Sequence, residues 1–257
     1  MHRHRIAVRS EREIDCMRRA GRIVGDVLRE LRDRVVPGWK TADIDRFAET
    51  YIRDRNALPS FKGYRGFPHA TCVCLNHELV HGMPSDKRAI EAGDLVKIDV
   101  GACYRNWHAD ASLTVGIEPL ADCDRQLVRV TEMALTRGLA AIRPGVTLQV
   151  VSSAIQDWIE SQGFYVPRHY IGHGIGRNLH EYPPVPNYRS EALPNPTLQA
   201  GMTLAIEPIV LARPSTTHVL PDGWTVASID RVRSAQCEHT IAVVETGCDI
   251  LTALQPH

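Results

Sequence analysis

The feature that most constrains the fold of this chain is an order of elements that occurs twice, about a hundred residues apart. A helical pattern stops at Pro37-Gly38, and a second one begins at Thr41. The same order returns where a helical pattern stops at Pro144-Gly145 and another begins at Thr147. Short β-type runs and turns follow each helix pair. We therefore predict an α+β protein made of two related helix–helix–strand halves.

The first helix shows how its buried side is specified. Ser10 and Glu13 have the spacing of a capping box, which favours a helix start. Between Ile14 and Val35, apolar residues recur at steps of three and four, which is typical of a helix with one buried stripe. A short coiled-coil seam would give the same spacing, but a stripe of this length inside a globular chain favours packing against a core.

The length of 257 residues suits one large domain or two intimately packed halves. We predict a single catalytic domain over residues 10–250, with halves of about 10–119 and 120–250. Residues 1–9 and 251–257 are expected to be terminal tails. No part of the sequence has the composition of a flexible linker.

Composition narrows the partners and the compartment. Thirty Lys and Arg balance thirty Asp and Glu, so a stable nucleic-acid or membrane surface is not expected. We find no apolar run that resembles a signal peptide or a membrane span. None of the seven cysteines forms a C-x-x-C pair, and Cys72-x-Cys74 is too tight for a structural zinc site. Reduced thiols and a cytoplasmic location are the expectation.

Two aspartates in neighbouring β-type runs are the first candidates for chemistry. If the chain turns at Tyr104-Arg105, Asp99 lies directly opposite Asp110 and both carboxylates share one face. Facing carboxylates are destabilising unless a cation lies between them. A turn at another position, or two solvated carboxylates, remains an alternative from this pair alone.

Three residues of the second half extend this set. His173 lies between glycines, which allow close approach to a ligand, although a single histidine is more often an ordinary core or surface residue. Glu207 and Glu238 are embedded in apolar strand-like runs, where a carboxylate needs a partner or must be protonated. Four carboxylates with one imidazole suit two divalent ions such as Co, Mn, Fe, Zn or Ni. Such pairs, about 3.5–4 Å apart, activate water and polarise carbonyls.

Two further histidines, His81 and His180, lie in Gly- or Pro-flanked loops and are candidate proton donors. With them, a series of motifs resembles type I methionine aminopeptidases in order along nearly the whole chain. These motifs are Val80-His81-Gly82-Met83-Pro84, Lys97 to Val100, Asp110 to Ser112, Tyr170 to Glu181, Asn187-Tyr188, Ala205 to Pro208 and Ser234 to Thr240. The resemblance implies the pita-bread fold, with two pseudo-symmetric halves around a central antiparallel sheet.

The resemblance also implies roles for the candidate residues. Asp99 resembles the aspartate that chelates one metal ion, and Asp110 and Glu238 resemble the two bridging carboxylates. His173 and Glu207 resemble the ligands of the other ion. Glu207 would in addition take the proton from the attacking water.

The two loop histidines and an apolar slot would contact the substrate. His81 resembles the histidine near the scissile amide, and His180 resembles the one that hydrogen-bonds the substrate carbonyl. The resemblance places five residues in or beside the pocket for the first side chain: Tyr64, Phe67, Cys72, Trp224 and Phe61. Any one of these aromatics alone fits an ordinary core residue equally well. The implied substrates are N-termini of nascent polypeptides near the ribosome, cleaved by a monomer when the second residue is small.

Three positions depart from the family pattern. Lys97 stands where asparagine is frequent, and Ala109 and Ala111 stand on either side of Asp110 where glycine and threonine are frequent. We expect Lys97 to point to the strand face opposite Asp99, with little effect. The missing threonine at position 111 is expected to remove a hydrogen bond that supports the metal site.

Two other functions are weighed against this one. A proline-directed peptidase of the same fold, such as aminopeptidase P or prolidase, usually carries a large extra N-terminal domain and differs around the His173 motif. A binding protein of this fold without catalysis would have lost metal ligands, whereas all five candidate positions are present.

Overall fold

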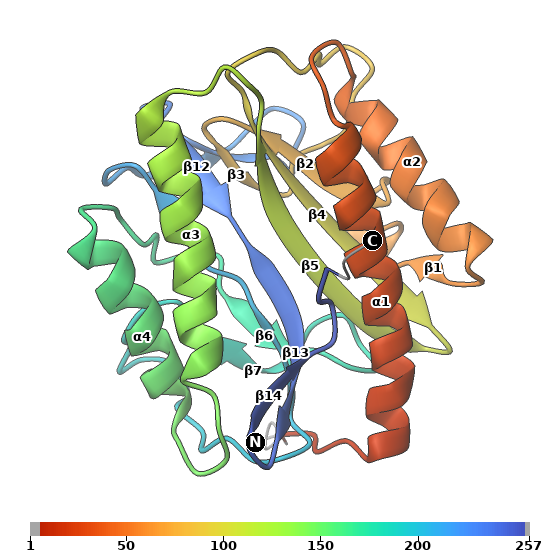
Figure 1. Ribbon diagram of the computed structural model, residues 1–257, viewed down its shortest axis with the longest axis vertical. Coiled ribbons are helices and arrows are strands. Elements are labelled where there is room, and N and C mark those ends of the chain that lie inside the picture. The colour runs from red at the N-terminus through yellow and green to blue at the C-terminus, as the bar shows by residue number, and fades with distance from the viewer. Residues whose placement is uncertain (1–5, 255–257) are drawn as a thin grey trace.

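The computed structural model describes residues 6–254, in which helices cover one face of a curled antiparallel sheet (Figure 1). The helices are α1 (Glu11–Arg34), α2 (Thr41–Asp54), α3 (Asp122–Ala140) and α4 (Leu148–Ser161), with a short 3-10 helix at Tyr64–Gly66. The strands of the first half are β1 (Leu58–Pro59), β2 (Thr71–Leu75), β3 (Glu78–Val80), β4 (Leu95–Tyr104) and β5 (Trp107–Gly116). The remaining strands are β6 (Gly172–Gly174), β7 (Glu181–Val185), β8 (Thr203–Ile206), β9 (Ile209–Leu211), β10 (Thr217–Val219), β11 (Val226–Ser228), β12 (Ser234–Gln236), β13 (Glu238–Val244) and β14 (Gly247–Ile250).

Helix α1 begins and packs as its sequence predicts. The backbone N–H of Ser10 donates to Glu13 Oε2 over 2.9 Å, which is one half of the capping box. The apolar stripe, represented by Val24, Leu28 and Leu31, is buried in a core shared with β4 and β5. The prediction of core packing is confirmed, and the coiled-coil alternative is wrong.

The two helix pairs are related in detail. Gly38 and Gly145, which follow the prolines between the helices, adopt left-handed φ values of 93° and 88°. Each turn is then tied to a later segment by one isolated antiparallel bridge, Lys40 with Ala89 and Thr147 with Thr197. Helices α3 and α4 cover β8 and β13 as α1 and α2 cover β4 and β5. The predicted duplication is therefore present in the fold.

The sheet joins the two halves through a narrow seam. The strands run in the order β1-β4-β5-β13-β8-β6-β7, with β2 added beside β4 and β14 beside β13. All of these pairs are antiparallel. The halves meet where β5 pairs with β13, at Ser112 with Glu238 and at Ala111 with His239. Residues at this seam are therefore positioned by backbone pairing between the two halves.

The β4–β5 hairpin corrects the predicted register. Its turn lies at Arg105 and Asn106, whose φ values of 52° and 63° are typical of a tight hairpin turn. Asp99 consequently faces Ser112, and Asp110 faces Gly101, so the predicted direct pairing of the two aspartates is wrong. Moving the turn by one residue shifts the register by two, which keeps both carboxylates on one face.

The parts of the predicted terminal tails that the structure describes are packed against the domain. The backbone N–H of Arg9 donates to the carbonyl of Gly201 over 2.8 Å. Leu251 is 2% exposed, and its carbonyl would lie 2.2 Å from a Cβ placed on Gly21 of α1, so this close approach requires glycine. Residues 1–5 and 255–257 of the predicted tails lie outside the described residues. Between residues 6 and 254, no helix has the length and apolar character needed to cross a membrane.

Candidate metal centre

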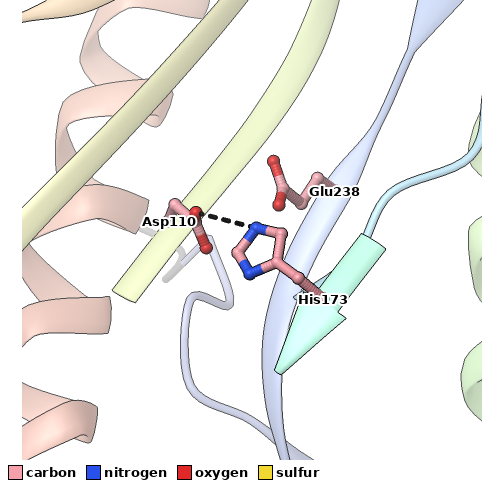
Figure 2. A group of neighbouring side chains, drawn as sticks. All are labelled: Asp110, His173 and Glu238. Atoms are coloured by element: carbon pink, nitrogen blue, oxygen red, sulfur yellow. Dashed lines mark ion pairs between the residues drawn. The ribbon is translucent and has the colours of Figure 1, made fainter. Parts of the chain in front are cut away.

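Three side chains from three strands converge behind the seam of the sheet. Figure 2 shows Asp110 of β5, His173 of β6 and Glu238 of β13 pointing toward one another. One ligand atom from each lies within 4.8 Å of the others, and all three residues are buried. His173 Nε2 is 3.6 Å from Asp110 Oδ2 and 3.9 Å from Glu207 Oε1. The two halves thus supply one compact set of atoms that could hold a metal ion.

Asp99 and Glu207 line the same cavity, which has a volume of about 270 Å³. Burial raises the pKa of Asp110 to about 6 and the pKa of Glu207 to about 8. Burial, reinforced by the neighbouring carboxylates, raises the pKa values of Asp99 and Glu238 well above their ordinary range. The protein alone therefore disfavours four charged carboxylates here, and a bound cation would reverse that preference.

The cluster has the chemistry that divalent metal ions require. Asp99 Oδ1 and Ser112 Oγ are buried atoms without a hydrogen-bond partner. No ion pair found among residues 6–254 joins a lysine or arginine to any of the four carboxylates. Buried carboxylates are costly unless they are paired or coordinate metal. Four carboxylates and one imidazole fit divalent cations of the first transition series, so the residues fit the use of a divalent metal.

Hydrogen bonds behind the cluster fix the orientation of its members. The Nδ1 atom of His173 lies 2.9 Å from the carbonyl oxygen of Gly174, so Nδ1–H donates there and the Nε2 lone pair faces the carboxylates. The hydroxyl of Thr240 lies 3.0 Å from Asp110 Oδ1. Sequence reasoning did not single out Thr240, although its position two residues after Glu238 places both on one strand face. The hydroxyl beside Asp110 therefore comes from Thr240 on the other side of the seam, and not from position 111.

The prediction for Lys97 is wrong. Residues two apart on a strand share a face, so Lys97 lies on the same face of β4 as Asp99. It is 1% exposed, and its Nζ donates to the carbonyls of Asn76 and Ser234 over 2.9 and 3.0 Å. Burial lowers the pKa of Lys97 to about 8. Instead of pointing away, this lysine ties the strand of Asp99 to strand β12 of the second half.

The two candidate substrate histidines flank the cluster. The ring centroids of His180 and His173 lie 4.1 Å apart, and His180 Nδ1 is 3.0 Å from the hydroxyl of Tyr64. His81 has a left-handed φ of 57° and lies edge-on to Tyr170. Burial lowers the pKa of His81 and brings that of His180 to about 4, so both rings are neutral at pH 7.

The residues predicted for the substrate pocket line the same 270 Å³ cavity. They are Phe61, Tyr64, Phe67, Cys72 and Trp224. Phe67 and Trp224 contact each other edge-to-face, with ring centroids 5.1 Å apart. The structure adds lining residues that sequence reasoning missed, namely Arg65, Tyr170, Ile171, Leu179 and Gln236. Tyr170 and Leu179 lay inside a recognised motif, but only the folded loop turns them toward the cavity.

A larger cavity of about 620 Å³ lies on the helix side of the sheet. It is lined by α1, α3 and the neighbouring strands, and includes Cys237 and His239. Because strand side chains alternate, β13 places Glu238 in the metal cluster and its two neighbours in this second cavity. None of the five predicted metal ligands lines the larger space, and all five line the smaller cavity.

Comparison with known proteins gives one family. The model of metallopeptidase family M24 matches residues 15–245. Methionine aminopeptidase 1 of Bacillus subtilis is 44% identical over 249 residues, which cover 96% of this chain and 99% of that protein. The methionine aminopeptidase of Escherichia coli K12 is 39% identical over 248 residues, which cover 96% of this chain and 94% of that protein.

Solved structures agree with these relatives. The methionine aminopeptidase of Thermotoga maritima has a TM-score of 0.94 and 41% identity, with coverage of 97% of this chain and 100% of that chain. A prolidase from Pyrococcus furiosus has a TM-score of 0.78 at 24% identity, and the match covers 66% of its chain. The second likeness shows the shared fold alone.

Proposed function

This chain belongs to metallopeptidase family M24, and we propose that it uses the five clustered ligands to hold two divalent metal ions. It is a metallopeptidase that removes N-terminal methionine, as its relatives of 39–44% identity over nearly the full chain are named to do. The observation that carries the proposal is the convergence of Asp99, Asp110, His173, Glu207 and Glu238 in one cavity with an aromatic slot.

Each ligand has an assigned place. Asp99 would hold one ion, His173 and Glu207 would hold the other, and Asp110 and Glu238 would be shared between the two. When bound, a pair of divalent ions supplies a water nucleophile at neutral pH and polarises the scissile carbonyl. The ligand set suits Co, Mn, Fe, Zn or Ni.

The side chains around the ions move protons and bind the substrate. Glu207, which lines the cavity beside Asp110 and His173, accepts the proton of the attacking water as the general base. His180, whose ring is neutral, donates a hydrogen bond to the substrate carbonyl. His81 lies at the same cavity and contacts the scissile amide.

The aromatic slot selects the first residue. Tyr64, Phe67 and Trp224 with Cys72 form an apolar pocket for an unbranched thioether, and each sulfur–aromatic contact adds roughly 0.3–1.5 kcal/mol. Valine or lysine at the first position should be refused, and norleucine should be cleaved slowly. The second residue lies near the ions and must be small. Phe61, at the rim, limits oxidised or extended methionine analogues.

We further propose that the natural substrates are N-termini of nascent polypeptides, cleaved in the cytoplasm near the ribosome by a monomer. The equal numbers of basic and acidic residues support a partner that binds through its N-terminus rather than through a charged nucleic-acid or lipid surface.

The test is a peptide panel run with and without chelator. The tripeptides Met-Ala-Ser, Met-X-Ser, X-Ala-Ser and Ala-Pro-type peptides separate the possible functions. We expect cleavage of Met-Ala-Ser that EDTA abolishes and Mn or Co restores. Faster cleavage of Ala-Pro peptides would favour a proline-directed peptidase. Comparable cleavage of Leu-, Phe- and Met-Ala-Ser would contradict a methionine pocket, and no cleavage by metal-loaded protein would favour a binding protein.

A further inference from the structure

The segment that leads into α1 runs from that helix toward strands of the second half (Figure 1). Arg9 forms an ion pair with Glu181 at the start of β7, and the two side chains are only 12% and 14% exposed. Its backbone N–H donates to the carbonyl of Gly201 over 2.8 Å. The ion pair between Arg9 and Glu181 joins residues 172 positions apart in the chain.

The surroundings of the Arg9 guanidinium leave room for little else. A Cβ built on Gly176 would lie 2.3 Å from Arg9 Nη2, so the absence of a side chain at position 176 makes space for the guanidinium. The guanidinium also lies 5.2 Å from the ring centroid of Trp107. A largely buried ion pair against a glycine and an aromatic ring is a fixed contact, unlike a solvated surface pair.

The ion pair holds the loop that carries His180. Glu181 directly follows His180, and its Oε1 accepts a hydrogen bond of 3.0 Å from the backbone N–H of Asn178. The N–H of Gly176 donates to the carbonyl of Asn178 over 3.1 Å, which closes the turn. Glu181 thus joins Arg9 on one side to the turn on the other.

His180 itself has few contacts of its own. Its ring stacks on the ring of Tyr64, lies beside the ring of His173, and places Nδ1 3.0 Å from the Tyr64 hydroxyl. Its backbone is part of the 176–181 turn, so the place of the ring in the cavity depends on how that turn is held. From the first half, the Arg9 side chain holds this turn together with the Trp107 ring, whose centroid lies 4.2 Å from the Arg177 guanidinium, and with the backbone N–H of His108, which donates to the carbonyl of Gly176 over 2.8 Å.

We propose that Arg9 is a positioning residue for catalysis, which holds His180 at the substrate carbonyl through Glu181. The inference rests on the proposed function of the cavity. It concerns how a residue of the first half holds a substrate-binding loop of the second half. Arg9 touches neither the metal ligands nor the substrate pocket.

The experiment compares Arg9→Ala, Arg9→Lys and Glu181→Gln in the Mn-loaded enzyme. Arg18→Ala is the matched control, because Arg18 also bridges from the N-terminal helix to the second half, through Asp249 at 2.6 Å, away from the cavity. For each protein, kcat and KM on Met-Ala-Ser, bound metal per chain and the melting temperature are measured.

We expect Arg9→Ala and Glu181→Gln to lower kcat by about 10- to 100-fold, because small displacements of a catalytic group have effects of this size. KM and bound metal should stay near those of Arg18→Ala, whereas the melting temperature should fall below that of Arg18→Ala, because each change leaves a largely buried charge without its partner. Arg9→Lys should recover part of the rate, and the double variant Arg9→Ala/Glu181→Gln should be no slower than either single one. If Arg9→Ala fails to fold, the kcat of Glu181→Gln still tests the inference.

Two results would overturn the inference. One is a kcat for Arg9→Ala or Glu181→Gln within twofold of the Arg18→Ala control. The other is a loss of activity that follows a loss of bound metal. If wild type and Arg18→Ala themselves leave Met-Ala-Ser uncleaved, the proposed function fails first, and the inference falls with it.

Discussion

The two halves share a layout but supply the candidate site in different ways. The first half contributes Asp99 and Asp110 from the two arms of one hairpin, β4 and β5. The second half contributes His173, Glu207 and Glu238 from β6, the end of β8 and the start of β13. One pair is therefore placed by local pairing, and the other three by strands that meet only in the folded sheet.

The difference shows how a duplicated fold becomes an asymmetric site. The seam between β5 and β13 consists of two residue pairs, and Glu238 lies in one of them. Asp110 is held from the other side of this seam by Thr240. The bridging carboxylates proposed above thus come one from each half, while Glu207, the proposed base, belongs to the second half alone.

The largest expected effect tests whether both halves are equally necessary. Asp110→Ala and Glu238→Ala should each abolish stable binding of two ions, and with it the cleavage of Met-Ala-Ser, because each carboxylate serves both ions. Metal analysis of the folded variants is the measurement. A folded Asp110→Ala protein that still holds two ions per chain would show that the first half does not supply a bridging ligand.

A smaller loss is expected for the proposed base of the second half. Glu207→Gln keeps an oxygen ligand but removes the proton acceptor, so kcat should fall by about 10²–10⁴-fold. Bound metal should change much less than in Asp99→Ala, which removes a ligand of the first half. Turnover of Glu207→Gln within a few-fold of wild type would mean that another group is the base.

Removal of the metal should make stability depend on pH through carboxylates of both halves. The pKa values of Asp110 and Glu207 in the fold are about 6 and about 8, above their ordinary values of 3.8 and 4.5. The folded chain therefore keeps protons that the unfolded chain has released, and their stabilisation is lost as pH rises. His173 and His180, with pKa values of about 4, act oppositely, but only below about 6.5.

Between pH 6.5 and 8, EDTA-treated protein should thus lose up to about 1.4 kcal/mol of unfolding free energy per pH unit through Glu207, whereas the contribution of Asp110 is mostly lost below this range, as pH rises through about 6. Melting curves over this range are the measurement, and excess Mn should remove the trend. Glu207→Gln should flatten it. A melting temperature that is flat or rises with pH in EDTA would contradict the burial of these groups.

The smallest effect concerns the tie between the halves. Lys97→Met removes two hydrogen bonds that link β4 to Asn76 and to Ser234 of the second half, and should lower the unfolding free energy by about 1–3 kcal/mol. Lys62→Met, which removes an exposed pair with Glu49, should cost less than about 1 kcal/mol. Equal denaturation midpoints for the two variants would mean that Lys97 is not a cross-link.

Local patterns determined much of this protein. The stripe of α1, the proline–glycine turns and the duplicated order follow from helix periodicity and backbone preferences, which act over a few residues. The residue types of the cluster were also readable, because a carboxylate in an apolar strand is costly without a partner. The motifs that resemble one family then gave the fold and the reaction.

Only the tertiary structure decided which atoms meet. The sequence placed the hairpin turn one residue early, because the choice of left-handed residues in a turn depends on the strands it joins. It did not reveal Thr240 as the partner of Asp110, nor Arg9 as the partner of Glu181. It also allowed no prediction that Lys97 would reach across to Ser234. These contacts join segments more than a hundred residues apart, and their geometry is set by how the two halves close on each other rather than by any local preference.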